Sequence, residues 1–370
     1  MDERDAYVAL NLIPLLGPRR IQALVERLGS AVAVWQAPAH RLVGVARITP
    51  ETAQRIVEAR VHVHPADELA SAQRQGVTVL TRHDTAYPSS LAAIADPPPV
   101  LYVQGTLLAQ DAVAVALVGS RRASPYGITT AERLAGELAE RGVTVISGLA
   151  RGVDAAAHRG ALRAGGRTIA VLGSGLLRLY PEEHRPLAQQ ISASGAVLSE
   201  FPLDTPPLRQ YFPQRNRVIS GLSLGVVIVE AAVTSGALIT ADLALEQGRD
   251  VFAVPGTVDA VTSRGTNALL RDGARLVTSA DDIVEALGLE QQLQRPSSWR
   301  SPRRPSATAS APALAVEETH LFQRLSDEPQ SIDEIATVCA WPTARALAVL
   351  TGLELKRLVK RLPGQRYLKA

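Results

Sequence analysis

The strongest constraint on the fold is a series of short apolar runs between residues 112 and 277, each of which ends in a small polar loop. Runs rich in Val and Ile, separated by segments with helical spacing, are typical of parallel strands that are buried on both faces and joined by crossover helices. Such strands all point the same way, so their C-terminal loops gather at one edge of the sheet. The pattern predicts an extended Rossmann-like α/β domain with a doubly wound, mostly parallel sheet.

The alternation also gives approximate bounds for these elements. Strands are expected over residues 113–118, 143–147, 168–173, 196–199, 225–230, 250–254 and 274–278. Helices are expected over about 125–141, 152–164, 183–194, 214–222, 236–248, 264–271 and 280–287. Before them, residues 65–111 are rich in proline and predict an extended lead-in with two short strands, over 77–81 and 100–103.

The polar loops repeat glycine, serine and arginine. Glycine lets the backbone approach a ligand closely, and a helix that starts after the loop offers unpaired N–H groups and the positive end of its dipole. An anion is therefore the expected guest. The residues concerned are Gly119, Ser120, Arg121 and Arg122, Ser147, Gly148 and Arg151, Gly173, and Ser235 and Gly236.

Two common nucleotide-binding motifs are missing from these loops. The segment after Gly119 lacks the second glycine of G-x-G-x-x-G, and none of the three lysines follows a glycine as a Walker A loop requires. The single cysteine, Cys339, has no partner for a disulfide or a multi-cysteine metal site and is expected in the core. No cofactor, metal or catalytic residue is expected.

Residues 1–65 predict a small helical domain that precedes the sheet domain, residues 66–290. Thr49 followed by Pro50 and Glu51 is a strong helix start, and apolar residues recur at helical spacing on both sides of Gly17 and Pro18. Two interpretations stay open. The turns are similar to helix-hairpin-helix elements, whose amides contact a nucleic-acid backbone, or the helices serve packing or partner binding.

A tract of Pro, Ser, Ala and Arg at residues 291–313 predicts a flexible linker. Residues 314–370 then predict three helices and a hairpin, which together make a winged-helix domain. Its second helix should start at a capping box formed by Ser331 and Glu334. The third helix offers only Arg345 to read bases, whereas the hairpin is basic; the hairpin either grips a nucleic-acid backbone or is a solvated face.

The positive charge is unevenly distributed. Residues 291–370 hold 12 Lys and Arg against 7 Asp and Glu, while the rest of the chain holds 27 against 29. In residues 1–290 the Lys and Arg positions are all arginine. This reflects either codon bias or a need for bidentate phosphate contacts. No apolar run is long enough to span a bilayer and the N-terminus does not resemble a signal peptide, so no membrane contact and a cytoplasmic location are expected.

Longer motifs across about residues 110–280 resemble the DprA (Smf) family of DNA-processing proteins. They are G-S-R at 119–121, S-G-L-A-R-G-V-D-A-A-A-H at 147–158, G-S-G at 173–175, S-E-F-P at 199–202, F-P-Q-R-N-R-V-I-S at 212–220 and G-T-N-A-L-L at 265–270. The resemblance implies a non-enzymatic, cytoplasmic protein that binds single-stranded DNA and loads the RecA recombinase in natural transformation. It also implies cooperation with single-stranded DNA-binding protein and a homodimer.

The residues agree with that ligand class, because single-strand binders combine a positive groove with aromatic faces. Arg121 is the strongest candidate for a phosphate ion pair. Arg215 and Arg217 are expected to flank one phosphate at a helix start, with Asn216 bonded to a base edge or sugar. For Phe212 and Phe201 the sequence is equally compatible with stacking on a base and with packing in the hydrophobic core. The carboxylates Asp154, Glu200 and Glu230 are expected to hold arginines or cap helices rather than act as acid and base, and His158 to be a packed residue.

Two rival functions stay open at this stage. Similar glycine-rich folds occur in phosphoribohydrolase-like enzymes that process nucleotides or sugar phosphates, although Thr234-Ser235-Gly236-Ala237 departs from their P-G-G-x-G-T pattern. A winged helix also occurs in transcription regulators, but the apolar third helix weakens that alternative.

Overall fold

The structure is a computed structural model that describes residues 1–290, 293, 316–325, 330–356, 358–362 and 366–369. The chain divides into two compact units, Met1–Gln294 and Arg295–Ala370. The domain bounds predicted from the sequence stay predictions, and the predicted linker lies outside the described residues apart from residue 293.

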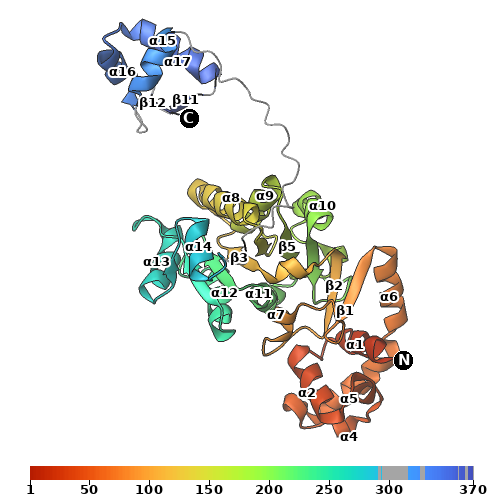
Figure 1. The fold of residues 1–370 in the computed structure, drawn as a ribbon. Helices are drawn as coiled ribbons and strands as arrows, with labels where there is room; N and C mark the ends of the chain where they lie inside the picture. The colour runs from red at the N-terminus through yellow and green to blue at the C-terminus, as the bar shows by residue number, and fades with distance from the viewer. Residues whose placement is uncertain (291–292, 294–315, 326–329, 357, 363–365, 370) are drawn as a thin grey trace. The chain divides into compact units, whose positions relative to one another are not determined.

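The larger unit is built on a sheet of nine strands in the order β1-β2-β6-β5-β4-β3-β7-β8-β9. Figure 1 labels β1, β2, β3 and β5 of this sheet. The strands from β6 to β9 in that order are parallel, whereas β1 and β2 are antiparallel additions at one edge. The predicted doubly wound, mostly parallel sheet is confirmed. The strands are β1 Val77–Thr81, β2 Val100–Gly105, β3 Ala114–Val118, β4 Thr144–Ser147, β5 Thr168–Val171, β6 Ala196–Ser199, β7 Gly225–Ile228, β8 Asp250–Ala253 and β9 Arg275–Leu276.

The strand order reverses beside β3. From β3 the chain adds β4, β5 and β6 on one side, and it then crosses back to add β7 on the other side. Ala116 of β3 is accordingly paired with Ile146 of β4 and with Val226 of β7. The loops that follow β3 and β7 run in opposite directions, and such a switch point is where open α/β sheets form a crevice.

Helices cover both faces of this sheet, because each strand is apolar on both sides. On one face α8, α9 and α14 pack on side chains such as Leu117, Val145 and Val227. On the other face α7, α11 and α12 pack on Ala116, Ile146 and Val226. The helices are α7 Ser89–Ala92, α8 Pro125–Glu140, α9 Val153–Arg163, α10 Arg185–Ser194, α11 Tyr211–Gly221, α12 Gly236–Glu246, α13 Arg264–Arg271 and α14 Ala280–Ala286.

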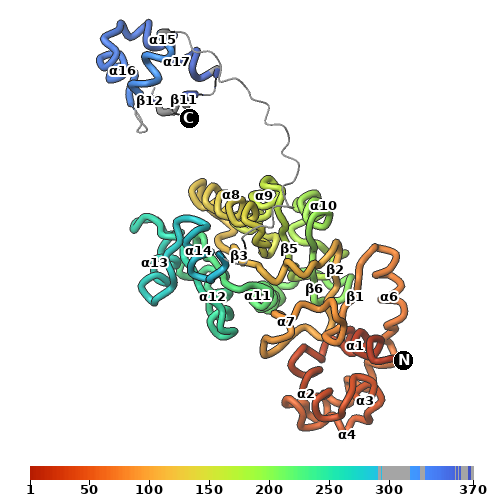
Figure 2. The backbone as a smooth tube through the Cα atoms, in the orientation of Figure 1, coloured from red at the N-terminus to blue at the C-terminus, as the bar shows by residue number. Residues whose placement is uncertain are grey.

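The N-terminal helices gather beside the β1–β2 edge of the sheet, as Figure 2 shows. They are α1 Glu3–Asn11, α2 Pro18–Leu28, α3 Ala31–Gln36, α4 Ala39–Leu42, α5 Pro50–Ala59 and α6 Pro65–Arg74. The predicted cap is present: the Thr49 hydroxyl accepts a hydrogen bond from the Thr52 amide at 3.2 Å. The extended lead-in predicted from residue 65 was wrong at its start, because Pro65 occupies the first turn of α6, where no N–H is needed.

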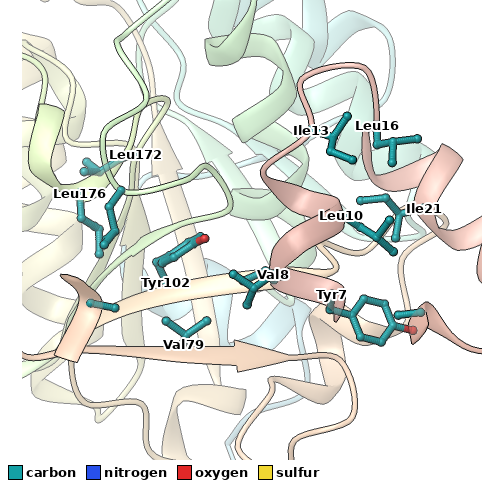
Figure 3. Close-up of a cluster of buried hydrophobic side chains, with 14 of the residues drawn as sticks. Tyr7, Val8, Leu10, Ile13, Leu16, Ile21, Val79, Tyr102, Leu172 and Leu176 are labelled. Atoms are coloured by element: carbon teal, nitrogen blue, oxygen red, sulfur yellow. The ribbon is translucent and has the colours of Figure 1, made fainter. Parts of the chain in front are cut away.

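One apolar cluster joins these helices to the sheet. Figure 3 shows Val8 of α1 beside Val79 of β1 and Tyr102 of β2, all of them buried. The cluster continues to Leu172 and Leu176, which follow β5 at the edge where the polar loops lie. Short 3-10 turns complete the larger unit at η1 Val45–Arg47, η2 Arg60–His62, η3 Ala109–Ala112, η4 Leu176–Arg178, η5 Glu182–His184 and η6 Val261–Ser263.

The second unit is the predicted winged helix. It contains α15 Val316–Arg324, α16 Ile332–Cys339, α17 Thr343–Leu355 and a sheet in the order β10-β12-β11. The hairpin strands are β11 Val359–Leu362 and β12 Arg366–Lys369, while β10 Gln330–Ser331 was not predicted. The capping box is present, since Ser331 and Glu334 each accept a hydrogen bond from the other's amide. Cys339 is buried in this core.

Of the basic side chains on the two hairpin strands the structure describes only that of Arg366, so the predicted nucleic-acid contact of the hairpin stays a prediction. Lys356, before the hairpin, forms an ion pair with Glu318 at 2.5 Å. Among the described residues no single helix is long and apolar enough to cross a membrane. Helices α16 and α17 taken together have the length and composition of a membrane span, but the two helices are bent by 105° relative to each other.

His158 of α9 is a packed residue, as expected, and is fully buried. The single hydroxyl hydrogen of Thr168 goes to the Val145 carbonyl at 2.7 Å, so Nδ1 of His158 donates to the Thr168 oxygen at 2.7 Å. Its Nε2 has no partner. Burial lowers the pKa of His158 to about 3, which keeps the ring neutral.

We expect this histidine to make the larger unit sensitive to acid. Its pKa rises from about 3 to about 6.5 on unfolding, so its contribution is complete above pH 6.5 and falls as the pH drops toward 3. At pH 5 the loss should be about 2 kcal/mol. Urea unfolding at pH 7.5 and pH 5 should show the difference between wild type and His158→Gln narrowing by that amount. His62→Gln, at an exposed site, is the control, and equal pH dependence in wild type and His158→Gln would contradict the expectation.

Candidate nucleic-acid interface

A cleft of about 1010 Å³ opens at the switch point, between the loops that follow β3 and β7. Its walls come from the β3 loop, the start of α9, the segment that leads into α11, and the start of α12. Nine of the predicted site residues line it: Gly119, Ser120, Arg121, Arg122, Phe212, Arg215, Asn216, Ser235 and Gly236. The sequence prediction and the cleft therefore coincide in position, while the role of each residue stays a prediction.

The β3 loop is held tightly on its inner side. The Ser120 amide donates to the Glu230 carbonyl at 2.7 Å, which ties the ends of β3 and β7 together. A Cβ on Gly119 would lie 2.7 Å from Cγ2 of Val153, and one on Gly152 would lie 2.2 Å from the Ser120 carbonyl. Gly152 also has a φ of 76°, which disfavours other residues. This close packing leaves the next two side chains, Arg121 and Arg122, on the exposed side of the loop.

Arg121 lies over an aromatic surface. Its guanidinium carbon is 4.8 Å from the centre of the Phe212 ring, and Phe212 meets the Tyr180 ring edge-on at 5.8 Å. Both rings line the cleft. Phe201 differs, because it is buried and packs on Tyr211 with ring centres 4.4 Å apart. Of the two phenylalanines that suited stacking or core, Phe212 lies in the cleft and Phe201 in the core.

Arg215 lies at the base of the cleft and is only 3% exposed. Its Nε and Nη1 are buried without a hydrogen-bond partner, and no ion pair involving Arg215 occurs among the described residues. Burial lowers its pKa to about 10, which still leaves it charged at neutral pH. A Cβ on Gly148 would lie 1.3 Å from Nη1, so the glycine is what makes room for this group. A buried cation with unused donors is costly unless an anion joins it.

The carboxylate of Asp154 influences that charge, because it raises the pKa of Arg215 against the effect of burial. It accepts hydrogen bonds from the amides of Gly148 at 3.2 Å and Ala150 at 3.3 Å, and it is buried. Burial raises the pKa of Asp154, while the charge of Arg215 and the two amides act in the opposite direction. Its main contacts are thus with the loop backbone, in keeping with the predicted structural role.

Arg217 does not reach the cleft, which corrects the expectation that it flanks one phosphate together with Arg215. It is 6% exposed and forms an ion pair with Glu200 and a longer one, 3.7 Å, with Asp96. The helix begins at residue 211 rather than 214. Positions two apart on a helix are related by a rotation of about 200° about its axis, so their side chains point to nearly opposite sides. One arginine therefore faces the cleft and the other faces the helix's opposite side.

The remaining wall is the start of α12. The Ser235 hydroxyl caps this helix by accepting from the Ala237 amide at 3.3 Å, and Gly236 has open space where a Cβ would stand. Asn216 reaches across from α11 and donates to the Gly236 carbonyl at 3.4 Å. Free amides at a helix start suit an anion, so this wall complements the arginines of the β3 loop.

Four predicted residues have other positions. Ser147 is buried and donates to the Leu117 carbonyl at 2.6 Å, which joins β4 to β3. A Cβ on Gly173 would lie 3.0 Å from the Phe212 ring, so this glycine leaves room for the ring. Gly148 and Arg151 line a smaller pocket of about 240 Å³ that shares Arg121 and Phe212 with the cleft.

Sequence reasoning missed several lining residues. Arg209 lies in the cleft wall and precedes Tyr211 and Phe212 in the chain. A cation so close in sequence to two aromatic residues could have identified it as a candidate site residue. Ile239 and Thr240 line the cleft from the first turns of α12, where their apolar spacing gave no such signal. Thr262 comes from η6, a turn that the sequence did not predict.

The other two carboxylates near the cleft are engaged in the fold. Glu230 accepts from the Ser124 amide at 2.9 Å and from its hydroxyl at 3.1 Å, at the start of α8. Glu200 holds Arg217; burial raises the pKa of Glu200, and the arginine partly offsets that shift. These contacts match the roles of helix cap and arginine partner that the sequence suggested. Among the described residues no group of three His, Cys, Asp or Glu side chains could hold a metal ion.

Fold and cleft together define a Rossmann-type protein with an arginine-lined crevice and a winged-helix unit. The sequence matches the family model for DNA recombination-mediator protein A over residues 78–288, which is more than half of the chain. A model of the DprA winged-helix domain matches residues 305–365. The chain belongs to the DprA family of DNA recombination mediators.

Individual relatives agree. Protein Smf of Escherichia coli K12 is 43% identical over 282 residues, which is 75% of this chain and 74% of that protein. DNA processing protein DprA of Bacillus subtilis is 41% identical over 221 residues, or 59% of this chain and 74% of that protein.

Two solved structures of the family are also similar. DprA from Streptococcus pneumoniae superposes with a TM-score of 0.66 at 33% identity, covering 77% of this chain and 98% of that one. DprA from Helicobacter pylori has a TM-score of 0.52 at 32% identity, covering 57% of this chain and 95% of that one, and its structure concerns the single-stranded DNA binding mode of that protein.

Buried and exposed ion pairs of arginine should contribute differently to the stability of the fold. Glu200→Ala leaves Arg217 buried without its main partner, which should lower the free energy of unfolding by about 3–5 kcal/mol. Arg163→Ala removes only an exposed ion pair with Glu132 and should leave the midpoint of unfolding almost unchanged. Thermal unfolding of both variants by circular dichroism tests this, and equal midpoints would mean that the Glu200–Arg217 pair does not hold α11.

Proposed function

We propose that this protein binds single-stranded DNA in the switch-point cleft, protects the strand and loads the RecA recombinase on it, with no bond made or broken. The observation that carries the proposal is Arg215. Its buried Nε and Nη1 have no hydrogen-bond partner, and it lines the cleft together with exposed Arg121 and the Phe212 ring. A phosphate is the anion whose geometry matches guanidinium donors, and an aromatic ring beside it suits a base.

The arrangement favours a single strand over a duplex. In a duplex the bases are paired and stacked inside, so Phe212 and Tyr180 have no base face to contact. In a single strand the bases are free to turn onto the rings while the phosphates follow the arginines. Specific base readout is not expected, because Asn216 is the one side chain on α11 in the cleft with amide donors and acceptors for a base edge, and stacking accepts every base.

Family membership supports the biological setting. The family model describes a recombination mediator, and the Helicobacter pylori relative has a single-stranded DNA binding mode. For this chain we accordingly propose work in natural transformation and recombination in the cytoplasm. Its proposed partners are RecA, single-stranded DNA-binding protein and a second copy of the chain as a homodimer.

The state of the carboxylates supports a role without catalysis. A general acid or base needs a carboxyl group within hydrogen-bond reach of the substrate. Here Asp154 is bound to loop amides, Glu200 to Arg217 and Glu230 to the start of α8. Each therefore already has a structural partner, which weighs against the rival of an enzyme that processes nucleotides or sugar phosphates.

Binding to labelled oligonucleotides over a salt series tests the proposal. Wild type should bind single strands more tightly than duplex, with steep salt dependence. Arg121→Ala should weaken single-strand binding by about tenfold and reduce the slope of log K against log salt by about 0.7, the value for one phosphate contact on a single strand. Fluorescence anisotropy measures both quantities.

The matched control is Arg163→Ala, which removes an exposed arginine of α9 that lines neither the cleft nor the smaller pocket and should leave affinity unchanged. A chain that ends at Gln294 should keep most of the affinity. Loss of binding confined to that shorter chain would move the site to the winged helix, and hydrolysis of a nucleotide or sugar phosphate by wild type would favour the enzymatic rival.

A further inference from the structure

The smaller pocket beside the cleft contains an arginine in a different state from the rest. Arg151 lines this pocket, and its Nε lies 2.5 Å from a carboxylate oxygen of Glu183. Among the described residues, none of the arginines that line the main cleft forms an ion pair. Their side chains are free to receive phosphate, whereas that of Arg151 is already occupied.

The competing carboxylate is held in place by the fold. Glu183 belongs to the η5 turn, and the next residue, His184, is buried with Nδ1 donating to the Leu149 carbonyl at 2.8 Å. Leu149 lies two residues before Arg151 in the same loop. The hydrogen bond from His184 therefore keeps the η5 turn against the loop that carries the arginine, and Glu183 stays within reach of it.

The ion pair itself is exposed to solvent and replaceable. The side chains of Arg151 and Glu183 are 54% and 53% exposed. The hydrogen bond between them raises the pKa of Arg151 and lowers the pKa of Glu183, so both are charged at neutral pH. Exposed pairs of this kind contribute little net stability, since water and salt screen them. A phosphate can take the place of this carboxylate.

We propose that Arg151 is a second phosphate subsite and that Glu183 is its built-in competitor, which a DNA strand must displace to occupy the smaller pocket. This inference rests on the proposed function, because it assumes that a strand lies in the main cleft. The smaller pocket shares Arg121, Arg122, Tyr180 and Phe212 with the main cleft, so it is a lateral continuation of the same surface. A strand that leaves the cleft past the aromatic rings therefore meets Arg151 next.

The arrangement makes affinity depend on strand length. A short oligonucleotide that fills only the main cleft does not reach Arg151, and Glu183 does not affect it. A longer strand gains a phosphate contact at Arg151 but loses part of that gain in breaking the ion pair. Glu183 is thus a residue that determines specificity, because it lowers the advantage of strands that extend beyond the cleft.

The test compares Glu183→Gln with Glu182→Gln in the full-length chain. The control removes the same charge one residue away, from a carboxylate that is 86% exposed and lies 3.9 Å from Arg185. Affinities are measured by anisotropy for oligo-dT from about 4 to about 30 nucleotides, a range that brackets typical site sizes. We expect Glu183→Gln to bind the long strands about two- to fivefold more tightly than wild type and the shortest strands equally. Glu182→Gln should resemble wild type at every length.

A double-mutant cycle identifies the path of the effect. In an Arg151→Ala background, Glu183→Gln should no longer change affinity, because the arginine through which it acts is absent. An equal gain in the Arg151→Ala background, or equal gains from Glu183→Gln and Glu182→Gln, would overturn the inference in favour of a general charge effect. Unchanged midpoints of thermal unfolding confirm that the variants are folded.

Failure of this inference is distinct from failure of the proposed function. If wild type and Glu183→Gln bind single strands equally at all lengths, the competitor role is wrong and the cleft function stands. If wild type binds no single-stranded DNA, the proposed function is overturned and this inference falls with it.

Discussion

The reversal of strand order beside β3 is the constraint on which the rest of the structure depends. Because β3 continues to β4 on one side and pairs with β7 on the other, the loops that follow β3 and β7 part and leave a crevice between them. The hydrogen bond from the Ser120 amide to the Glu230 carbonyl joins the two strand ends below that crevice. A fixed floor of this kind positions Arg121 and the start of α12 without help from a ligand.

Helix α11 holds two buried arginines in different environments. Both Arg215 and Arg217 are buried, and a buried guanidinium costs several kcal/mol in lost hydration unless partners replace the water. Arg217 obtains that compensation from Glu200 and Asp96, and it fixes the rotation of the helix about its axis. The same rotation turns Arg215 toward the cleft, where its donors stay unused. Among the described residues, Arg215 thus has no ion-pair partner to offset its burial, in contrast to Arg217.

Sequence patterns were sufficient for the sheet, because its strands are short, apolar on both faces and separated by regular helices. They also located the cleft, and nine of the predicted site residues line it, since parallel strands bring their C-terminal loops together whatever lies between them. They failed for Arg217, whose burial depends on the rotation of α11 and on carboxylates 17 and 121 positions away in the chain. The pairing of Arg151 with Glu183 was equally invisible, because it joins two separate loops that lie 32 positions apart in the chain.

The N-terminal helices take part in positioning the cleft rather than forming a separate appendage. Asn11 of α1 donates to the Glu200 carbonyl at 3.1 Å, and Arg19 of α2 forms an ion pair with Asp96 at 3.1 Å. Both contacts end on the residues that hold Arg217, so α1 and α2 brace the network that orients α11. The turn before α2 is also closed on itself, because Arg20 donates to the Leu15 carbonyl at 2.8 Å. Of the two interpretations of these helices, their packing role accounts for the contacts that they make, and a nucleic-acid contact by the turn is not needed to explain any of them.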